Sequence, residues 1–317
     1  MGALDLEHDP KSGTLFVSVN DLDPRVPNQV LAFAANGMLQ YSVSVGSRPG
    51  PLATSEDGSK LYVALAGAAR IVTLDLTSHA VTSFQSLAPQ VGGSGNGVYP
   101  APNDLEVVPG LADTLAVSAL QLGTTSPLNP LLVHARSVES LKGTSAAIAD
   151  SVRALLPIDA QVTWAAGAFL TKVTRQSNGT VTSAFDLNVT DVINQLVPVG
   201  KDRLATDSGA LLDAQSGSLI GRLATHGGVV ASDDGTKVYV ASTNGSTFTL
   251  TCYDARTAKQ TGSTSLALPQ GYTWSGDTQH VELELLGARG LAMRSLGLYG
   301  LGSLVLYPGI LDSVTGC

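Results

Sequence analysis

The chain has 317 residues, 44% of them hydrophobic and only 14% charged, so it can bury a sizeable core. Its net charge of −8 and its lack of any lysine or arginine cluster count against nucleic acid and anionic membrane surfaces as partners. No apolar run is long enough to span a bilayer, and residues 1–10 lack the basic and apolar parts of a signal peptide.

The chain begins with strand-like segments separated by turns. Residues 4–19, LDLEHDPKSGTLFVSV, predict two strands around a turn at Gly13, with His8 near that turn at the surface. Residues 28–45, NQVLAFAANGMLQYSVSV, predict a third and a fourth strand. Lysine and glutamate are sparse throughout, which favours strands over long exposed helices.

The next stretch, residues 53–81, recurs later in the chain. It reads ATSEDGSKLYVALAGAARIVTLDLTSHAV, and residues 231–261 read ASDDGTKVYVASTNGSTFTLTCYDARTAKQT. Asp57 aligns with Asp234, an offset of 177 residues, and each begins an Asp-Gly pair that predicts a tight hairpin turn. The offset equals four repeats of about 44 residues, a period typical of β-propeller blades.

The chain is therefore predicted to be all-β, a single β-propeller domain of seven four-stranded blades. The blades are expected over residues 1–46, 47–88, 100–145, 150–187, 190–224, 226–269 and 279–317. Insertions rich in glycine and proline at residues 88–102, and a second insertion at residues 121–130, fall in connecting loops, where function tends to sit.

Two groups of segments carry a family resemblance. GSRPGPLATSEDGSKLYVALAGAARIVTLDL (residues 46–76) and ASDDGTKVYVAS (residues 231–242) resemble the YVTN-type seven-bladed propellers of bacterial surface and periplasmic proteins. NDLEVVPGLADTLAVSAL (residues 103–120), GARGLAMRS and GSLVLYPG are similar to secreted bacterial propellers found beside immunoglobulin-like domains. The resemblance implies a secreted or periplasmic chain whose signal peptide has been removed. It implies no single activity, because such propellers serve as enzymes, scaffolds and adhesion modules.

Polar residues at the starts of the predicted first strands form the candidate site. In a propeller the first strands line a central channel, so residues far apart in sequence meet at one mouth. At or near these starts stand Asp5, Asn103, Asp104, Asp150, Asp191, His226 and His280, with Glu282 next along. Oxygen donors favour Ca²⁺ or Mg²⁺, and histidines bring in Zn²⁺ or Mn²⁺. The alternative is that these residues only stabilise turns.

The predicted metal ligands are Asp5, Asn103, Asp104, Asp191 and His280. PAPND at residues 100–104 also resembles the Pro-Asn-Asp calcium-ligand segment of the senescence-marker and paraoxonase propellers, although those have six blades. A divalent ion (Ca, Zn or Mn) would polarise an ester and activate water, with Asp104, His226 and His280 as catalytic residues.

Arg153 and Trp274 are the predicted ligand contacts. Arg153 stands in a predicted first strand, where it would bind an anion or pair with Asp150. Trp274 lies in GYTWSGDTQH, where it would contact an aromatic ligand or pack between blades.

The motifs of strong catalytic sites are missing. The sequence has no GxSxG, SxxK, HExxH, P-loop or EF-hand motif. It therefore favours a monomeric, extracytoplasmic module that binds a protein or a glycan on one propeller face. The alternative is a metal-dependent hydrolase of small esters, lactones or phosphotriesters at the channel mouth.

The two cysteines show neither zinc-site nor CxxC spacing. TLTCYDA predicts that Cys252 is a buried strand residue. Cys317 is expected to be a free thiol, and a disulfide between the two is the alternative.

Overall fold

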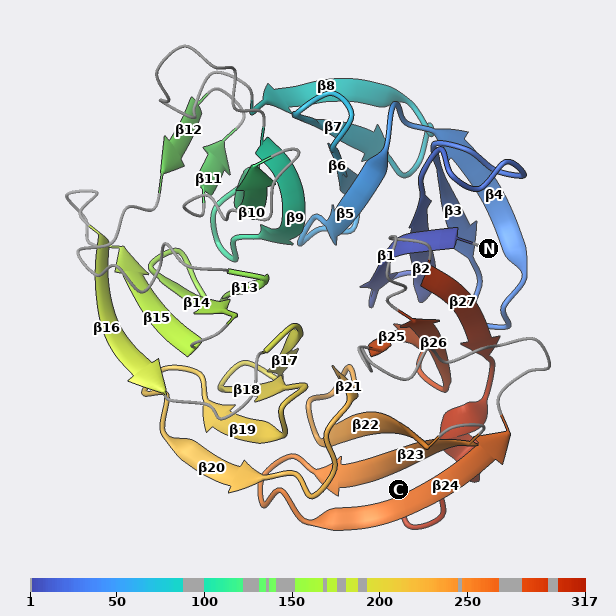
Figure 1. Cartoon of the computed structure of the whole chain (residues 1–317), viewed down its shortest axis with the longest axis vertical. Coiled ribbons are helices and arrows are strands. Elements are labelled where there is room, and N and C mark those ends of the chain that lie inside the picture. The colour runs from blue at the N-terminus through green and yellow to red at the C-terminus, as the bar shows by residue number, and fades with distance from the viewer. Residues whose placement is uncertain are drawn as a thin grey trace. The chain divides into compact units, whose positions relative to one another are not determined.

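The computed structural model is built almost entirely of strands (Figure 1). It describes residues 2–87, 100–121, 131–134, 137–140, 152–167, 170–175, 181–187, 193–244, 247–267, 281–295 and 302–317. These residues contain one short 3₁₀ helix, η3 (Ile310–Ser313), and none of their helices has the length and apolar content of a membrane span. The predicted all-β class is confirmed.

The chain divides into two compact units. The first comprises Met1–Val17, Leu31–Ser42 and Asn194–Cys317, and the second comprises Ser18–Val30 and Val43–Ile193. The prediction of a single domain stays a prediction.

The second unit holds three four-stranded antiparallel sheets among its described residues. In each sheet, strands that are consecutive in sequence are neighbours in space. Their strands are β5 (Pro49–Thr54), β6 (Lys60–Leu65), β7 (Arg70–Asp75) and β8 (Val81–Ser86); β9 (Pro100–Val107), β10 (Thr114–Gln121), β11 (Leu131–His134) and β12 (Ser137–Ser140); and β13 (Ala154–Pro157), β14 (Val162–Ala166), β15 (Leu170–Arg175) and β16 (Val181–Leu187).

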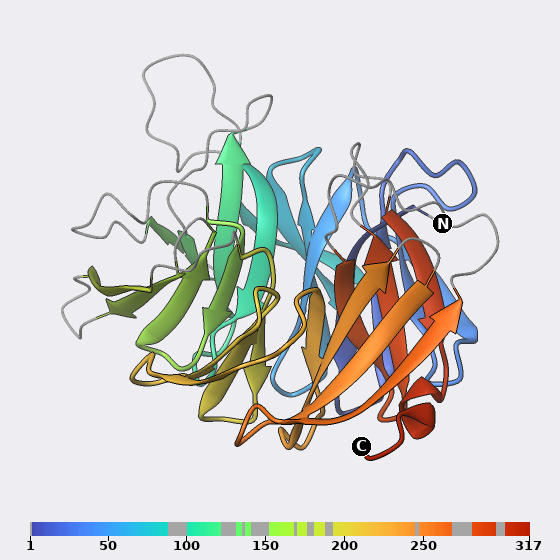
Figure 2. The same cartoon turned by 60° about the horizontal axis from the view of Figure 1, so that its bottom comes forward.

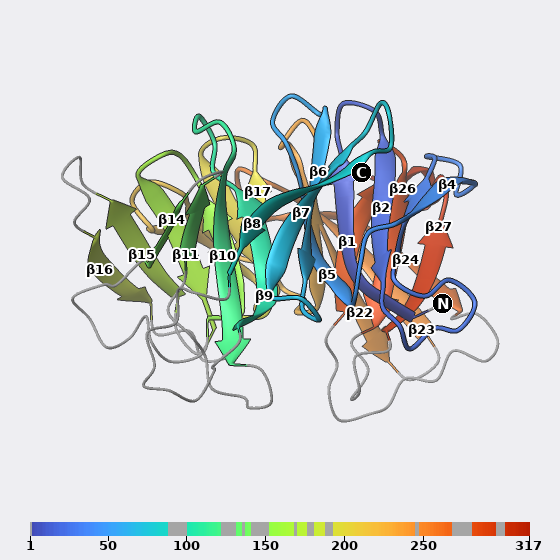
Figure 3. The same ribbon diagram turned by 90° about the horizontal axis from the view of Figure 1, so that it is seen from above.

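The first strands of these three sheets are neighbours. β9 packs against β5 on one side and against β13 on the other, and Figure 3 shows β5 beside β9. Tyr62, Ile71, Leu105 and Val117 are buried together between the first two sheets. Sheets stacked through their first strands are the arrangement expected of propeller blades.

The first unit holds two more four-stranded sheets with the same connectivity. Their first strands, β17 and β21, pack against each other, and β21 also packs against β25 (Val281–Leu286) of the remaining sheet. The strands are β17 (Leu196–Val199), β18 (Arg203–Thr206), β19 (Ala210–Asp213) and β20 (Leu219–Arg222); and β21 (Gly228–Ala231), β22 (Lys237–Asn244), β23 (Thr247–Asp254) and β24 (Gln260–Ala267).

The remaining sheet has seven strands in the order β25-β26-β27-β1-β2-β3-β4, with the ends of β2–β4 assigned to the second unit. The strands are β25 (Val281–Leu286), β26 (Gly290–Ser295), β27 (Gly302–Tyr307), β1 (Gly2–Asp9), β2 (Thr14–Val19), β3 (Gln29–Phe33) and β4 (Leu39–Ser44). β1 joins β27 through two antiparallel pairs, Gly2 with Ser303 and Ala3 with Gly302. The start of the chain therefore extends a sheet made by its last strands.

The doubled sequence stretch forms the same turn twice. Asp57 and Asp234 each accept a hydrogen bond from the serine two residues before, at 2.6 Å in both turns. Each also accepts bonds from the backbone N–H and hydroxyl two residues after, at 3.0 and 2.7 Å for Asp57 and 2.9 and 2.7 Å for Asp234. Gly58 and Gly235 follow with φ of 67° and 65°, which glycine adopts without strain. The predicted hairpin turns are confirmed.

Candidate functional site

A buried arginine, Arg294, lies beside two carboxylates where β1, β25 and β26 meet in the first unit. Glu282 of β25 lies opposite Arg294 of β26 in the strand register, and the two side chains form an ion pair. Asp5 of β1 is 4.0 Å from the same guanidinium, and the side chain of Arg294 is only 10% exposed. Asp5 and Glu282, which the sequence places at first-strand starts, therefore share an arginine that the sequence reading missed.

The burial of this group shifts its pKa values. Burial lowers the pKa of Arg294 to about 10, although the neighbouring Asp5 carboxylate acts in the opposite direction. Glu284 lies two residues after Glu282 in β25. Burial also raises the pKa of Glu284 well above the usual glutamate value. The nearby Glu7 and Asp5 carboxylates reinforce that shift, because like charges disfavour ionisation. The raised pKa favours the protonated form of Glu284, whereas Arg294 stays charged at neutral pH even with its lowered pKa.

Polar side chains connect first strands that do not form a hydrogen-bonded ladder with each other. Glu282 accepts a hydrogen bond from the backbone N–H of Leu6 at 3.2 Å. Gln195, just before β17, hydrogen-bonds to two other first strands. Its Nε2 donates to the carbonyl of Leu283 in β25, and its Oε1 accepts from the N–H of Val229 in β21, both at 3.0 Å. Backbone groups need such partners once neighbouring sheets exclude water from them.

The second unit uses predicted site residues in the same way. Asn103 of β9 donates from Nδ2 to the carbonyl of Arg153 at 2.8 Å. Asp104, also of β9, accepts a bond from the N–H of Leu155 in β13 at 2.5 Å. These contacts give both residues a structural role between neighbouring first strands. Their predicted metal and catalytic roles, and the ligand contact of Arg153, stay predictions.

Of the other predicted site residues, the structure describes only His226. His226 lies just before β21, where a Cβ on Gly209 would approach its Cδ2 to 3.0 Å. Asp5 and His226 belong to the first unit, and Asn103 and Asp104 belong to the second. Asp150, Asp191, Trp274 and His280 lie outside the described residues, as do most of the two predicted insertions. Among the described residues, no group of three or more His, Cys, Asp or Glu side chains is arranged to hold a metal ion.

His8 is buried rather than at the surface, which corrects the sequence prediction. It is 8% exposed, and its Nε2 has no hydrogen-bond partner in the part of the chain that the structure describes. Burial lowers the pKa of His8, and the Asp233 and Asp9 carboxylates oppose that shift only in part. The imidazole is thus favoured in its neutral form.

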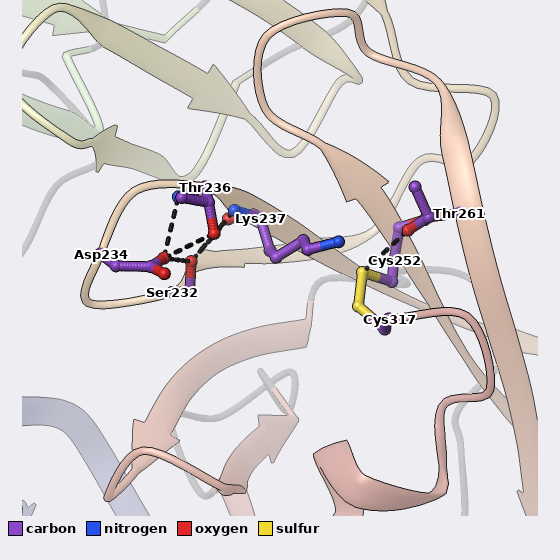
Figure 4. The surroundings of a disulfide bond; sticks show 7 residues. All are labelled: Ser232, Asp234, Thr236, Lys237, Cys252, Thr261 and Cys317. Carbon is purple, nitrogen blue, oxygen red and sulfur yellow. Dashed lines mark hydrogen bonds between the residues drawn. A yellow bond between two sulfur atoms is a disulfide. The ribbon is translucent and has the colours of Figure 1, made fainter.

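Cys317 is not a free thiol, because it forms a disulfide with Cys252 (Figure 4). The two Cα atoms are 6.2 Å apart, and Cys252 is fully buried in β23. The hydroxyl of Thr261 in β24 lies 3.3 Å from both the carbonyl oxygen and the sulfur of Cys252 and can donate to either. The prediction of a buried Cys252 is confirmed, and the free thiol at Cys317 is wrong because η3 turns the chain back onto β24.

No protein-family model and no curated protein matches the chain. Solved structures do match it, among them the β-propeller domain of Cps50 (Swd1) from Myceliophteria thermophila, with 13% identity, a TM-score of 0.63 and 96% of each chain covered. Citrobacter koseri AztD matches at 12% identity and a TM-score of 0.57, over 92% of this chain and 80% of that one. The WD40 β-propeller domain of Doa1 matches at 10% identity and 0.53, over 96% and 92%. At such identities the likeness shows the fold alone, and that fold is a β-propeller.

Proposed function

We propose that the chain is an extracytoplasmic β-propeller of the YVTN type that binds a protein partner and has no catalytic activity of its own. The likeness to propeller domains along almost the whole chain carries this proposal. The WD40 domain of Doa1 is among the matching structures, and that architecture commonly presents loops and strand edges to other proteins.

The proposal includes seven blades. Five four-stranded sheets account for five of them. The seven-stranded sheet would supply two more, one of β1–β4 and one of β25–β27 completed by Gly2 and Ala3. The use of N-terminal residues as the last strand of the last blade is a common way to join the ends of a propeller sheet.

The first-strand contacts give three of the candidate site residues a structural role. Asp104, Asn103 and Glu282 each hydrogen-bond to the backbone of a neighbouring first strand or to the residue just before it. A carboxylate engaged in this way already has partners that explain its place in the fold. No contact among the described residues favours the hydrolase alternative, and a metal-dependent activity would show itself in the test below.

The Cys252–Cys317 disulfide supports the extracytoplasmic location. Disulfides persist in secreted and periplasmic proteins, whereas the thiols of cytosolic proteins are usually kept reduced. The chain's composition agrees with a soluble binding module, since its formal net charge of −8 is spread without basic clusters.

The test begins with chemical crosslinking of the purified chain to an extracytoplasmic fraction of its source, followed by identification of the partner by mass spectrometry. The purified partner should then bind saturably to the purified chain in calorimetry. Replacing residues 88–99 by a short Gly-Ser linker should weaken binding at least about tenfold, or about 1.4 kcal/mol. Arg256→Ala, in a tight turn of the first unit, is the matched control and should bind as the wild type does.

Two results would overturn the proposal. One is the lack of saturable binding by any purified candidate partner. The other is chelator-sensitive turnover of a panel of esters, lactones and phosphotriesters by the purified chain, which would favour the metal-dependent hydrolase instead.

A further inference from the structure

The last residues of the chain form a strap across the first unit. We call residues 308–317 the C-terminal strap; it follows β27, contains η3 and ends at Cys317. Figure 2 shows its red coil beside the orange strands of the β21–β24 sheet. Ile310 and Val314 are buried in a cluster that includes Phe248, Leu250 and Met293. The strap therefore closes one side of an apolar core that two sheets share.

Close backbone contact positions the strap on β24. A Cβ on Gly262 would collide with the carbonyl oxygen of Thr315, and a Cβ on Gly316 would collide with that of Thr261. Two glycines are thus required where the strap and β24 approach each other. The approach brings the sulfur of Cys317 to that of Cys252 (Figure 4).

The polar contacts that hold the strap to the rest of the first unit are few. Its backbone N–H at Leu311 donates to the carbonyl of Arg289 at 3.0 Å. Arg289 and Asp312 form an ion pair with side chains 72% and 49% exposed, and exposed ion pairs contribute little. Ile310 and Val314 are buried, and Leu311 packs against the same cluster. The disulfide adds a covalent link between the strap and the sheet.

The two cysteine residues differ in their exposure. Cys252 is fully buried, whereas Cys317 is exposed. A thiolate attacks a disulfide at the sulfur it can reach, and the other sulfur leaves as a thiolate. The Thr261 hydroxyl lies 3.3 Å from both the carbonyl oxygen and the sulfur of Cys252, so it can donate its proton to the sulfur as negative charge develops there. The exposure of Cys317 and the hydroxyl of Thr261 beside Cys252 therefore both favour attack at Cys317, with Cys252 as the leaving thiolate.

We propose that the Cys252–Cys317 disulfide is a reducible latch that holds the C-terminal strap, and that a dithiol is the reductant that opens it. A thiolate of the dithiol attacks Sγ of Cys317, the Cys252–Cys317 bond breaks, and Cys252 leaves as a thiolate that takes up a proton. The second thiol of the reductant then attacks the mixed disulfide and releases Cys317 as a thiol. The reductant is oxidised to its own disulfide, and two electrons and two protons reach the protein.

Opening the latch changes the surface of the first unit. Once Cys317 is free, the strap leaves β24, and Ile310 and Val314 leave the shared core. Cys252 and the apolar side chains around it become accessible. The latch is closed where thiols are oxidised and open where a dithiol is supplied. This inference goes beyond the proposed partner binding and does not depend on it.

Hydrogen exchange tests the opening. The amides of Leu311, Val314 and Cys317 donate hydrogen bonds within the strap or to Arg289. After reduction with dithiothreitol they should exchange at least about tenfold faster, while the amides of β25 and β26 keep their rates. Cys317→Ser should show the fast rates with and without reductant. Unchanged strap rates in reduced protein, or faster exchange throughout β25 and β26, would overturn the latch.

Trapping tests the direction of attack. Wild-type protein is treated with glutathione, a monothiol, and quenched with iodoacetamide before peptide mapping. Glutathione should be found on Cys317 and the alkyl group on Cys252; the reverse pattern would overturn the assignment.

The hydrogen bond from Thr261 is tested by the rate of reduction. Thr261→Val should slow reduction by dithiothreitol about threefold or more, because the leaving thiolate loses its donor. Thr264→Val, three residues along β24, is the matched control and should keep the wild-type rate. Equal rates in the two variants would contradict the role of Thr261.

Discussion

Replacing Gln195 by methionine keeps the length of the side chain but removes both of its hydrogen bonds. The amide bridges two other first strands, through the carbonyl of Leu283 and the N–H of Val229, each at 3.0 Å. A neutral hydrogen bond contributes about 0.5–1.5 kcal/mol, and a buried group left without a partner costs about 1–3 kcal/mol. Both bonds are partly buried, so we expect Gln195→Met to lower the free energy of unfolding by about 2–4 kcal/mol.

Urea unfolding followed by tryptophan fluorescence measures this loss. With a slope of about 3 kcal/mol per molar urea, the midpoint should fall by roughly 1 M without a change in slope. Gln260→Met, at the exposed start of β24, is the matched control and should stay within about 0.5 kcal/mol of the wild type. If the two variants are equally stable, the bridge between first strands does not hold the sheets together as we have argued.

Three further predictions concern turns and buried titratable groups. Asp57→Ala and Asp234→Ala should each lower the free energy of unfolding by about 1–2 kcal/mol and by similar amounts, because the turns share the same bonds; a clear difference in urea midpoint would contradict their equivalence. Glu284→Gln should be more stable than the wild type at neutral pH, because the raised pKa of Glu284 means that its ionisation is penalised in the folded state. The difference in free energy of unfolding between the two proteins should grow by about 1.4 kcal/mol per pH unit above the usual glutamate pKa, until the folded-state pKa is passed. A difference that does not depend on pH would refute this reasoning. Since burial lowers the pKa of His8, wild-type stability should fall as the pH drops below the usual histidine value. His8→Phe should reduce that dependence, and thermal melts at several pH values that show the same dependence in both proteins would contradict it.

The turns could be read from the sequence because their chemistry is local. Asp57 and Asp234 bond to residues two positions away, so the Asp-Gly pair and its flanking serine carry the whole signal. The all-β class followed from the same stretches, since the strands they predict alternate with such turns. Repetition at a fixed offset then predicted the kind of architecture that the solved structures confirm.

The contacts of the candidate site depend on residues far apart in the chain. Gln195 bonds to Leu283, 88 positions away, and no local pattern distinguishes it from other amides. The pairing of Arg294 with Glu282 follows from the register of β25 with β26, which places the two residues opposite each other. The disulfide joins cysteines separated by 65 residues, and only the return of η3 onto β24 brings them together.

Asn103 and Asp104 show a different limit of the sequence reading. The sequence located them at a first-strand start, and the structure places both in β9. Their side chains, however, contact the backbone around β13, a partner that a list of polar residues does not reveal. A polar residue in such a strand serves either a ligand or a neighbouring strand, and only the three-dimensional arrangement separates the two.

The pairing of Ala3 with Gly302 has a consequence for synthesis of the chain. Ribosomes add about 5–20 residues per second, so roughly 15–60 s separate the emergence of these two partners. Throughout that time the first residues of β1 cannot pair with β27, although the sheets in between can already fold in order. Pairing over such a sequence distance also gives a high contact order, which slows folding. The junction of β1 with β27 is therefore expected to be the last part of the first unit to form, and the part most exposed to wrong strand partners before it does.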